Sequence, residues 1–167
     1  MSTGPAAAGF LVDAPIGWSA DWAWGLPLIV LTILIHVFGL SLLRERALRH
    51  FKQPNQLKQP TAEFVVVMGA ITLAVTILHA AEAGVWAWAY KSLGALPDYS
   101  TAMLYSLNAI TSYGHTNISL NDYWHLLGAL EALNGWLLFG LSTAFLFGMI
   151  QKVWSVEDQK NGNRFSE

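Results

Sequence analysis

Residues 102–118 read AMLYSLNAITSYGHTNI, and long apolar runs lie on both sides of them. The spacing of apolar residues from Ala102 predicts a short amphipathic helix that ends at the polar segment TSYGHT, residues 111–116. Lipid cannot satisfy the N–H and C=O groups of a non-helical backbone, so such a segment at membrane depth must be surrounded by protein or water-filled space. We therefore predict that residues 102–118 form a re-entrant pore loop.

The composition of the chain is typical of a polytopic membrane protein. Of its 167 residues 54% are hydrophobic and 12% are charged, and 8 are tryptophan. The absence of cysteine excludes disulfides, thiolate chemistry and cysteine-based metal sites. The net charge is −2, whereas proteins that bind nucleic acid usually carry an excess of positive charge, so we expect no nucleic-acid partner.

The first apolar run, residues 26–43, is uncharged and would be about 27 Å long as a helix, just enough to cross a bilayer. A basic cluster follows at residues 44–52, and no Lys or Arg precedes it. The positive-inside rule then places the N-terminus outside and the basic cluster inside. We expect residues 1–25 to be an extracytoplasmic tail, and residues 26–60 to be a transmembrane helix with a basic cytoplasmic connection, which can itself extend as an interfacial helix.

Two further apolar runs, residues 61–90 and 126–154, flank the quoted stretch, and tryptophans and tyrosines mark their outer ends. Each run is long enough to span a membrane. With the N-terminus outside, the connection between these two runs faces outside, and residues 155–167 form a cytoplasmic tail. The charge pattern thus predicts a multi-pass protein with its C-terminus in the cytoplasm.

The order helix, short helix, polar loop, helix resembles the pore module of the potassium-channel superfamily. AMLYS at 102–106 looks like the family's ALYFS-type pore helix, and ITS at 110–112 is similar to its LTT approach to the filter. Similarity to small bacterial members extends to further segments of the outer helix, turret and inner helix: 79–87, 94–96, 130–135 and 140–147. The resemblance covers roughly residues 61–150.

The resemblance implies an all-α membrane fold with three transmembrane helices and a re-entrant pore helix with its filter loop. Its pore module, residues 61–154, would comprise four parts: an outer helix at 61–90, a pore helix at about 100–111, a filter at 112–116 and an inner helix at 126–154. The additional helix at 26–43 is expected to pack at the periphery. One subunit supplies only one loop, so the resemblance implies a homotetramer in the bacterial inner (plasma) membrane.

The activity implied by the resemblance is passive conduction of K⁺ or Na⁺, without catalysis and without a cofactor. Membrane lipid and the other subunits are the expected partners, and a separate regulatory partner remains possible. Two other functions stay open. One is a channel-fold protein that does not conduct and has a structural or regulatory role, and the other is a haem or metal membrane protein that uses His36, His79 or nearby acids.

The filter departs from the family's TVGYG, whose backbone carbonyls and threonine hydroxyl replace the hydration shell of potassium. Without gaps, SYGHT at residues 112–116 falls on these five positions. Ser112 retains a hydroxyl and Gly114 the first glycine, so a monovalent cation would bind the carbonyls of residues 112–114. Tyr113, His115 and Thr116 replace the family's valine, tyrosine and second glycine. A second register, which places Tyr113-Gly114 on the family's Tyr-Gly, stays open.

The substitution at Thr116 is the most disruptive, because a β-branched residue is strained where φ must be positive. We therefore expect weak or absent selectivity for potassium over sodium. His115 would occur four times near the outer mouth, either as a pH-sensitive group or as a neutral ring bonded to the pore helix. Thr111 and Asn117 flank the filter, and Asn117 replaces an acid that would concentrate cations.

Ionisable residues within the spans are candidates for function. His79 and Glu82 are three residues apart on one helix face, and Glu131 lies near the outer end of the last run. These residues either bind a divalent metal or support the pore loop from behind, by bonding to backbone N–H groups or to His79. His36 is either a haem ligand or proton relay, or a packed, hydrogen-bonded residue.

The last apolar run carries small residues at Gly135, Gly140, Ser142 and Thr143. Small residues at these positions can form a hinge and line a cavity. They also allow helices to pack closely in lipid. The two interpretations are compatible, and we retain both.

Overall fold

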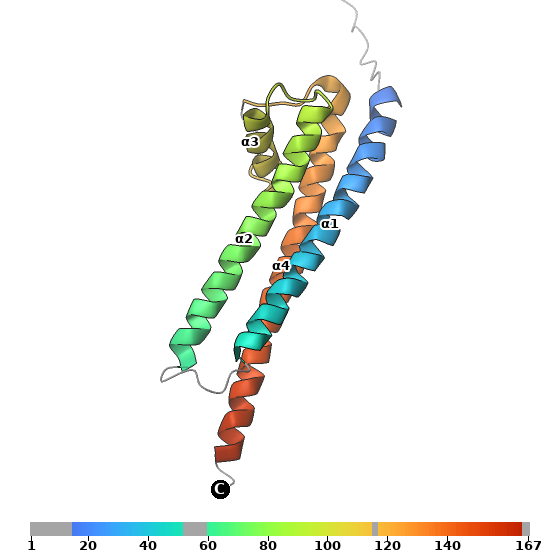
Figure 1. Ribbon diagram of the computed structural model, residues 1–167. Coiled ribbons are helices and arrows are strands. Elements are labelled where there is room, and N and C mark those ends of the chain that lie inside the picture. Colours follow the sequence, from blue (N-terminus) through green and yellow to red (C-terminus); the bar gives the residue numbers. More distant parts are fainter. Residues whose placement is uncertain (1–14, 52–59, 115–116, 165–167) are drawn as a thin grey trace, which may run out of the picture.

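The computed structural model describes residues 15–51, 60–114 and 117–164, and within these ranges all regular structure is helical. Three long helices, α1, α2 and α4, run side by side, and the short helix α3 lies beside one end of α2 and α4 (Figure 1). The elements in chain order are α1 (Pro15–Phe51), α2 (Pro60–Ser92), α3 (Tyr99–Ile110), the 3-10 turn η1 (Asp122–Trp124) and α4 (His125–Arg164).

Three helical stretches are long and apolar enough to cross a membrane: Gly17–Arg49, Phe64–Ser92 and Asp122–Lys152. They overlap the three apolar runs of the sequence, so the prediction of an all-helical fold with three helices able to span a membrane is confirmed. Many of their large apolar side chains point outward, among them Val66 and Phe139, which are 70% and 66% exposed. Lipid can cover such side chains at no cost in hydration.

Helix α1 is longer than the sequence predicted. It begins at Pro15, inside the segment expected to be a tail. At the other end it continues through the basic cluster to Phe51, in agreement with the helical extension that the sequence left open there. Proline suits the first turn of a helix because its missing N–H would have no helical partner there. An apolar run marks only the part of a helix that crosses hydrocarbon, and the backbone hydrogen bonds continue on both sides of it.

Helix α4 is also longer than the sequence predicted. Its backbone stays helical to Arg164, through residues that were expected to form a tail. Hydrophilic residues such as Glu157 and Lys160 are good helix formers, so a polar composition did not imply a helix end here. The predicted bounds of α2 and α3 differ from the observed ones by one or two residues, which is the usual uncertainty of a helix end.

Helix α3 begins at a side-chain cap. Asp98 accepts hydrogen bonds from the backbone N–H of Thr101 at 2.9 Å and from its hydroxyl at 2.8 Å. An aspartate at this position satisfies an N–H group that has no partner within the helix. The cap fixes where the chain turns after α2.

The largest apolar cluster joins all four helices around α3. Trp86 and Tyr90 of α2 and Leu127 of α4 are fully buried in it, and Tyr105 of α3 packs edge-on against Tyr90, with ring centroids 5.2 Å apart. The cluster surrounds α3 on the side that faces the three long helices. The position of α3 is therefore determined by packing against α2 and α4.

Candidate functional site

Helix α3 ends in a Schellman motif, in which the first residues beyond the helix bond back to its last turn. The N–H of Ser112 donates to the carbonyl of Ala109 at 2.9 Å, and the N–H of Tyr113 donates to that of Asn108 at 3.0 Å. Ser112 has the positive φ of 54° that this motif requires, a conformation usually taken by glycine. The segment predicted to form the filter therefore starts as a helix cap.

Beyond the cap, the chain is exposed. The side chain of Tyr113 is 83% exposed, and Gly114 has a φ of 95°. The hydroxyl of Ser112 accepts a 3.0 Å hydrogen bond from the indole N–H of Trp136 in α4. The predicted site residues His115 and Thr116 lie outside the described residues, so the strain expected at Thr116 stays a prediction.

The two residues that flank this segment also have defined positions. The hydroxyl of Thr111 donates to the carbonyl of Leu107 at 2.6 Å, which ties it to the last turn of α3. Asn117 is exposed on the other side of the segment. The side chain of Thr111 therefore contributes to the end of α3.

Glu131 of α4 is fully buried behind α3. It accepts a hydrogen bond from the Tyr90 hydroxyl of α2 at 2.6 Å and a short one from the Ser106 hydroxyl of α3. The Ser106 hydroxyl also lies 2.8 Å from the carbonyl oxygen of Ala83 in α2. Glu131 thus lies behind α3 and supports it, which is one of the two roles that the sequence left open. It contacts α3 through the Ser106 hydroxyl and not through backbone N–H groups.

Gly135 lets the end of α3 lie directly on α4. A Cβ atom at Gly135 would collide with the carbonyl group of Ile110. At Gly140, by contrast, a Cβ would meet nothing within 4 Å. Of the two glycines named as a hinge or packing site, Gly135 is therefore required for close packing within the subunit.

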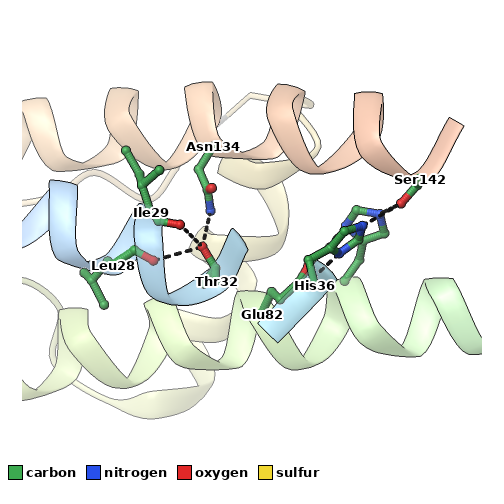
Figure 2. A network of polar contacts seen from close by, with 8 residues as sticks. Leu28, Ile29, Thr32, His36, Glu82, Asn134 and Ser142 are labelled. Atoms are coloured by element: carbon green, nitrogen blue, oxygen red, sulfur yellow. Dashed lines mark hydrogen bonds and ion pairs between the residues drawn. The ribbon is translucent and has the colours of Figure 1, made fainter. Parts of the chain in front are cut away.

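A second polar group lies deeper in the bundle, where His36 of α1 is fully buried between α2 and α4 (Figure 2). Its Nδ1 is 2.8 Å from a carboxylate oxygen of Glu82, and its Nε2 is 3.0 Å from the Ser142 hydroxyl. Nε2 of His79 is also 3.0 Å from the Ser142 hydroxyl, and its Nδ1 is 3.5 Å from the other oxygen of Glu82. Both rings thus lie between Glu82 at one end and Ser142 at the other.

This group differs from the one predicted. Within the described residues, the histidine–acid group that could hold a metal comprises His36, His79 and Glu82. Glu131 is not part of it, because Glu131 faces Tyr90 and Ser106 instead. The spacing of His79 and Glu82 was visible in the sequence. His36 was among the candidate ligands named from the sequence, but no local pattern showed that it contacts Glu82, 46 residues later in the chain.

One turn before His36, a further buried contact joins α1 to α4 (Figure 2). The amide N–H of Asn134 donates to the hydroxyl of Thr32 at 2.8 Å, and that hydroxyl lies 2.9 Å from the carbonyl of Leu28. Helix α1, expected at the periphery, is therefore joined to the rest of the chain by buried polar contacts with both α2 and α4.

A cavity of about 490 Å³ connects the two regions. Its wall includes His79 from the deeper group, Thr111 and Ser112 from the end of α3, and Trp136 and Phe139 from α4. The hydroxyl of Thr143, expected to line a cavity, donates to the carbonyl of Phe139 at 2.9 Å. The cavity brings the half-buried imidazole of His79 and the polar segment to one space.

Comparison of the chain with protein families, with curated proteins and with solved structures found no match. The potassium-channel resemblance therefore rests on the motifs quoted from the sequence. The function has to be argued from the geometry of the helices.

Proposed function

We propose that the protein is a pore-loop channel for monovalent cations, with four copies of the chain around one pore and little selectivity between K⁺ and Na⁺. The observation that carries this proposal is the position of α3. A short helix lies against α2 and α4, and the chain leaves its inner end as a polar, non-helical segment at Ser112.

The depth of this inner end supports a re-entrant helix. Ile110 packs in one cluster with Ala83 of α2 and Leu138 of α4. At 1.5 Å per residue, Ala83 lies about 14 Å from the end of α2 at Ser92. The hydrocarbon core of a bilayer is about 30 Å thick, so α3 would end near its middle. A polar segment at that depth is tolerated only beside protein or water.

The electrostatics of α3 suit a cation. The C-terminal end of a helix carries about half a negative charge, and here it points at the polar segment. The N–H groups of Ser112 and Tyr113 are already bonded to α3. The segment therefore presents carbonyl oxygens, which are the groups that replace water around a permeating cation.

Copies of the chain would complete the pore. Large apolar side chains on one subunit remain exposed on α3 and on α4, including Leu104, Trp136 and Phe139. Since a single loop cannot enclose an ion, these surfaces would face the neighbouring subunits and the pore. In this arrangement the filter comprises Ser112, Tyr113, Gly114, His115 and Thr116, with its outer end facing the outside of a bacterial inner membrane.

Ion flux into proteoliposomes tests the proposal. Purified protein should admit K⁺ and Na⁺ at similar rates, and the double variant Tyr113→Val, Thr116→Gly should favour K⁺ because it restores the family's small and flexible residues. Tyr123→Val, which changes an exposed tyrosine outside the segment, should leave the flux ratio unchanged. If intact tetramers admit neither ion at any pH, the channel-fold protein does not conduct, and a structural or regulatory role replaces the proposal.

A further inference from the structure

The group formed by His36, His79 and Glu82 has the dimensions of a metal site. One ligand atom from each residue can be chosen so that all lie within 4.8 Å of one another. The carboxylate of Glu82 is 2.8 Å from Nδ1 of His36 and 3.5 Å from Nδ1 of His79. Two ligands of a tetrahedral zinc ion, each about 2.0–2.1 Å from the metal, are about 3.3 Å apart. Small side-chain movements would therefore place all three ligands on one ion.

An unpartnered oxygen points to a missing ligand in this group. Glu82 is fully buried, and its Oε2 makes no hydrogen bond within the part of the chain that the structure describes. Nδ1 of His79 lies 3.5 Å from this oxygen, which is too far for a good hydrogen bond. A buried carboxylate oxygen without a partner is costly. A bound cation would supply the partner.

We propose that His36, His79 and Glu82 bind a divalent transition-metal ion such as Zn²⁺. Two imidazoles and one carboxylate are ligands that suit zinc and its neighbours, whereas Ca²⁺, Mg²⁺ and the alkali ions prefer oxygen alone. Three protein ligands leave a fourth position for water. The site goes beyond the proposed channel function, because its ion differs in chemistry from the permeant ions and binds away from the polar segment.

Ser142 holds both imidazoles in the required orientation. When Nδ1 of each ring binds the metal, each Nε2 carries the proton, and both Nε2–H groups can donate to the Ser142 hydroxyl oxygen, which has two lone pairs. The observed distance from each Nε2 to that oxygen is 3.0 Å. Metal-bound histidines usually have such a partner at the other nitrogen. Ser142 is thus a positioning residue.

The cavity gives the ion a route to the site. His36 and Glu82 are closed off from it, but His79 retains 27% side-chain exposure and forms part of the cavity wall. The same cavity is large enough, at about 490 Å³, for the water that would complete the coordination. Metal and water can therefore reach the ligands without unfolding of the helices.

Metal analysis of tag-free protein in detergent tests this proposal. After equilibration with ZnCl₂ and removal of free ion, we expect one zinc per chain, and with CoCl₂ we expect the visible absorption of four-coordinate cobalt. His79→Gln and Glu82→Gln should each weaken zinc binding by about 100-fold or more. Ser142→Ala should weaken it by about 10- to 100-fold, as is usual for residues that orient metal ligands.

Two variants serve as matched controls. Glu131→Gln changes a buried acid outside the group, and His125→Ala changes a histidine whose side chain is 63% exposed. Both should bind zinc as tightly as the wild type does. His79→Gln alters a residue at the cavity wall and should stay folded. Its thermal midpoint should therefore no longer rise with added zinc, whereas that of the wild type should.

The proposal is overturned if folded wild-type protein retains neither zinc nor cobalt at micromolar concentrations. It is equally overturned if His79→Gln and Glu82→Gln bind zinc as tightly as the wild type does. Neither measurement involves ion flux. A failure of the channel proposal would therefore leave the metal stoichiometry intact, and the reverse also holds.

Discussion

The hydroxyl of Tyr90 in α2 donates a 2.6 Å hydrogen bond to the carboxylate of Glu131 in α4, and both residues are fully buried. The same carboxylate accepts from Ser106 in α3. One acid therefore joins three helices at the point where α3 packs against α2 and α4. The position of the polar segment after α3 depends on this contact.

Replacing Glu131 should loosen α3. Glu131→Ala leaves the buried hydroxyl of Tyr90 with only a long contact, 3.5 Å to the carbonyl oxygen of Leu127. A poorly paired buried group costs about 1–3 kcal/mol in addition to the lost packing. Glu131→Gln retains an acceptor oxygen and should lose less. The free energy of unfolding, measured by SDS titration of the protein in mixed micelles, checks this order. Equal losses in the two variants would show that the carboxylate oxygens do not hold α3.

Alanine at Gly135 should be far more harmful than alanine at Gly140. At Gly135 the new Cβ meets the backbone of Ile110, which cannot rotate away as a side chain can. We expect a loss of about 1–3 kcal/mol, typical of overpacking, together with a changed ion flux if the channel proposal holds. Gly140→Ala meets nothing and should be neutral or slightly stabilising. A neutral Gly135→Ala would mean that α3 lies farther from α4 than described.

The cap of α3 should weaken in acid. The backbone N–H and the hydroxyl of Thr101 donate to the charged carboxylate of Asp98 and lower its pKa. The stabilisation is therefore fully present above the ordinary pKa of about 3.9 and is lost as the pH falls through the lower, folded value. Asp98→Asn keeps a capping oxygen that does not titrate. The check is the thermal midpoint of the wild type and of Asp98→Asn, measured from neutral to acidic pH. The two midpoints should differ above the folded pKa of Asp98 and coincide below it.

Thr32 and Asn134 should show strong coupling in a double-mutant cycle. Thr32→Val leaves the buried amide of Asn134 without its acceptor, whereas the pair Thr32→Val, Asn134→Leu removes both polar partners. Replacing both is expected to cost less than the sum of the single changes, by about 0.5–3 kcal/mol. The SDS titration used for Glu131 measures this difference. Strict additivity would show that the contact between α1 and α4 contributes nothing.

The sequence predicted those features that local patterns encode. Apolar runs located the three long helices, and the spacing of apolar residues from Ala102 indicated the short helix α3. The same patterns gave wrong positions for the start of α1 and the end of α4. The helical backbone continues there into residues that are too aromatic or too polar to count as a membrane run. Apolarity measures the part of a helix in lipid and does not measure its length.

The candidate sites required information that no short stretch contains. Nothing near His36 indicates that it meets Glu82, because the contact depends on how α1 packs beside α2. The positive φ at Ser112 was equally hidden, since serine gives no sign of the left-handed conformation that glycine usually marks. Backbone strain was expected at Thr116 instead. The helix cap after Ile110 accounts for that positive φ at Ser112.

The order of His36 and Glu82 along the chain has a consequence for biosynthesis. A ribosome delivers α1 before α2, so the imidazole is already present when the acid arrives 46 residues later. An isolated charged residue at the centre of a helix costs about 2.5–3.5 kcal/mol to insert. We therefore expect the first helix to assist insertion of the second, so that His36→Leu reduces the fraction of newly made chains whose α2 integrates into microsomal membranes. Glu82→Gln in the same chain should restore it.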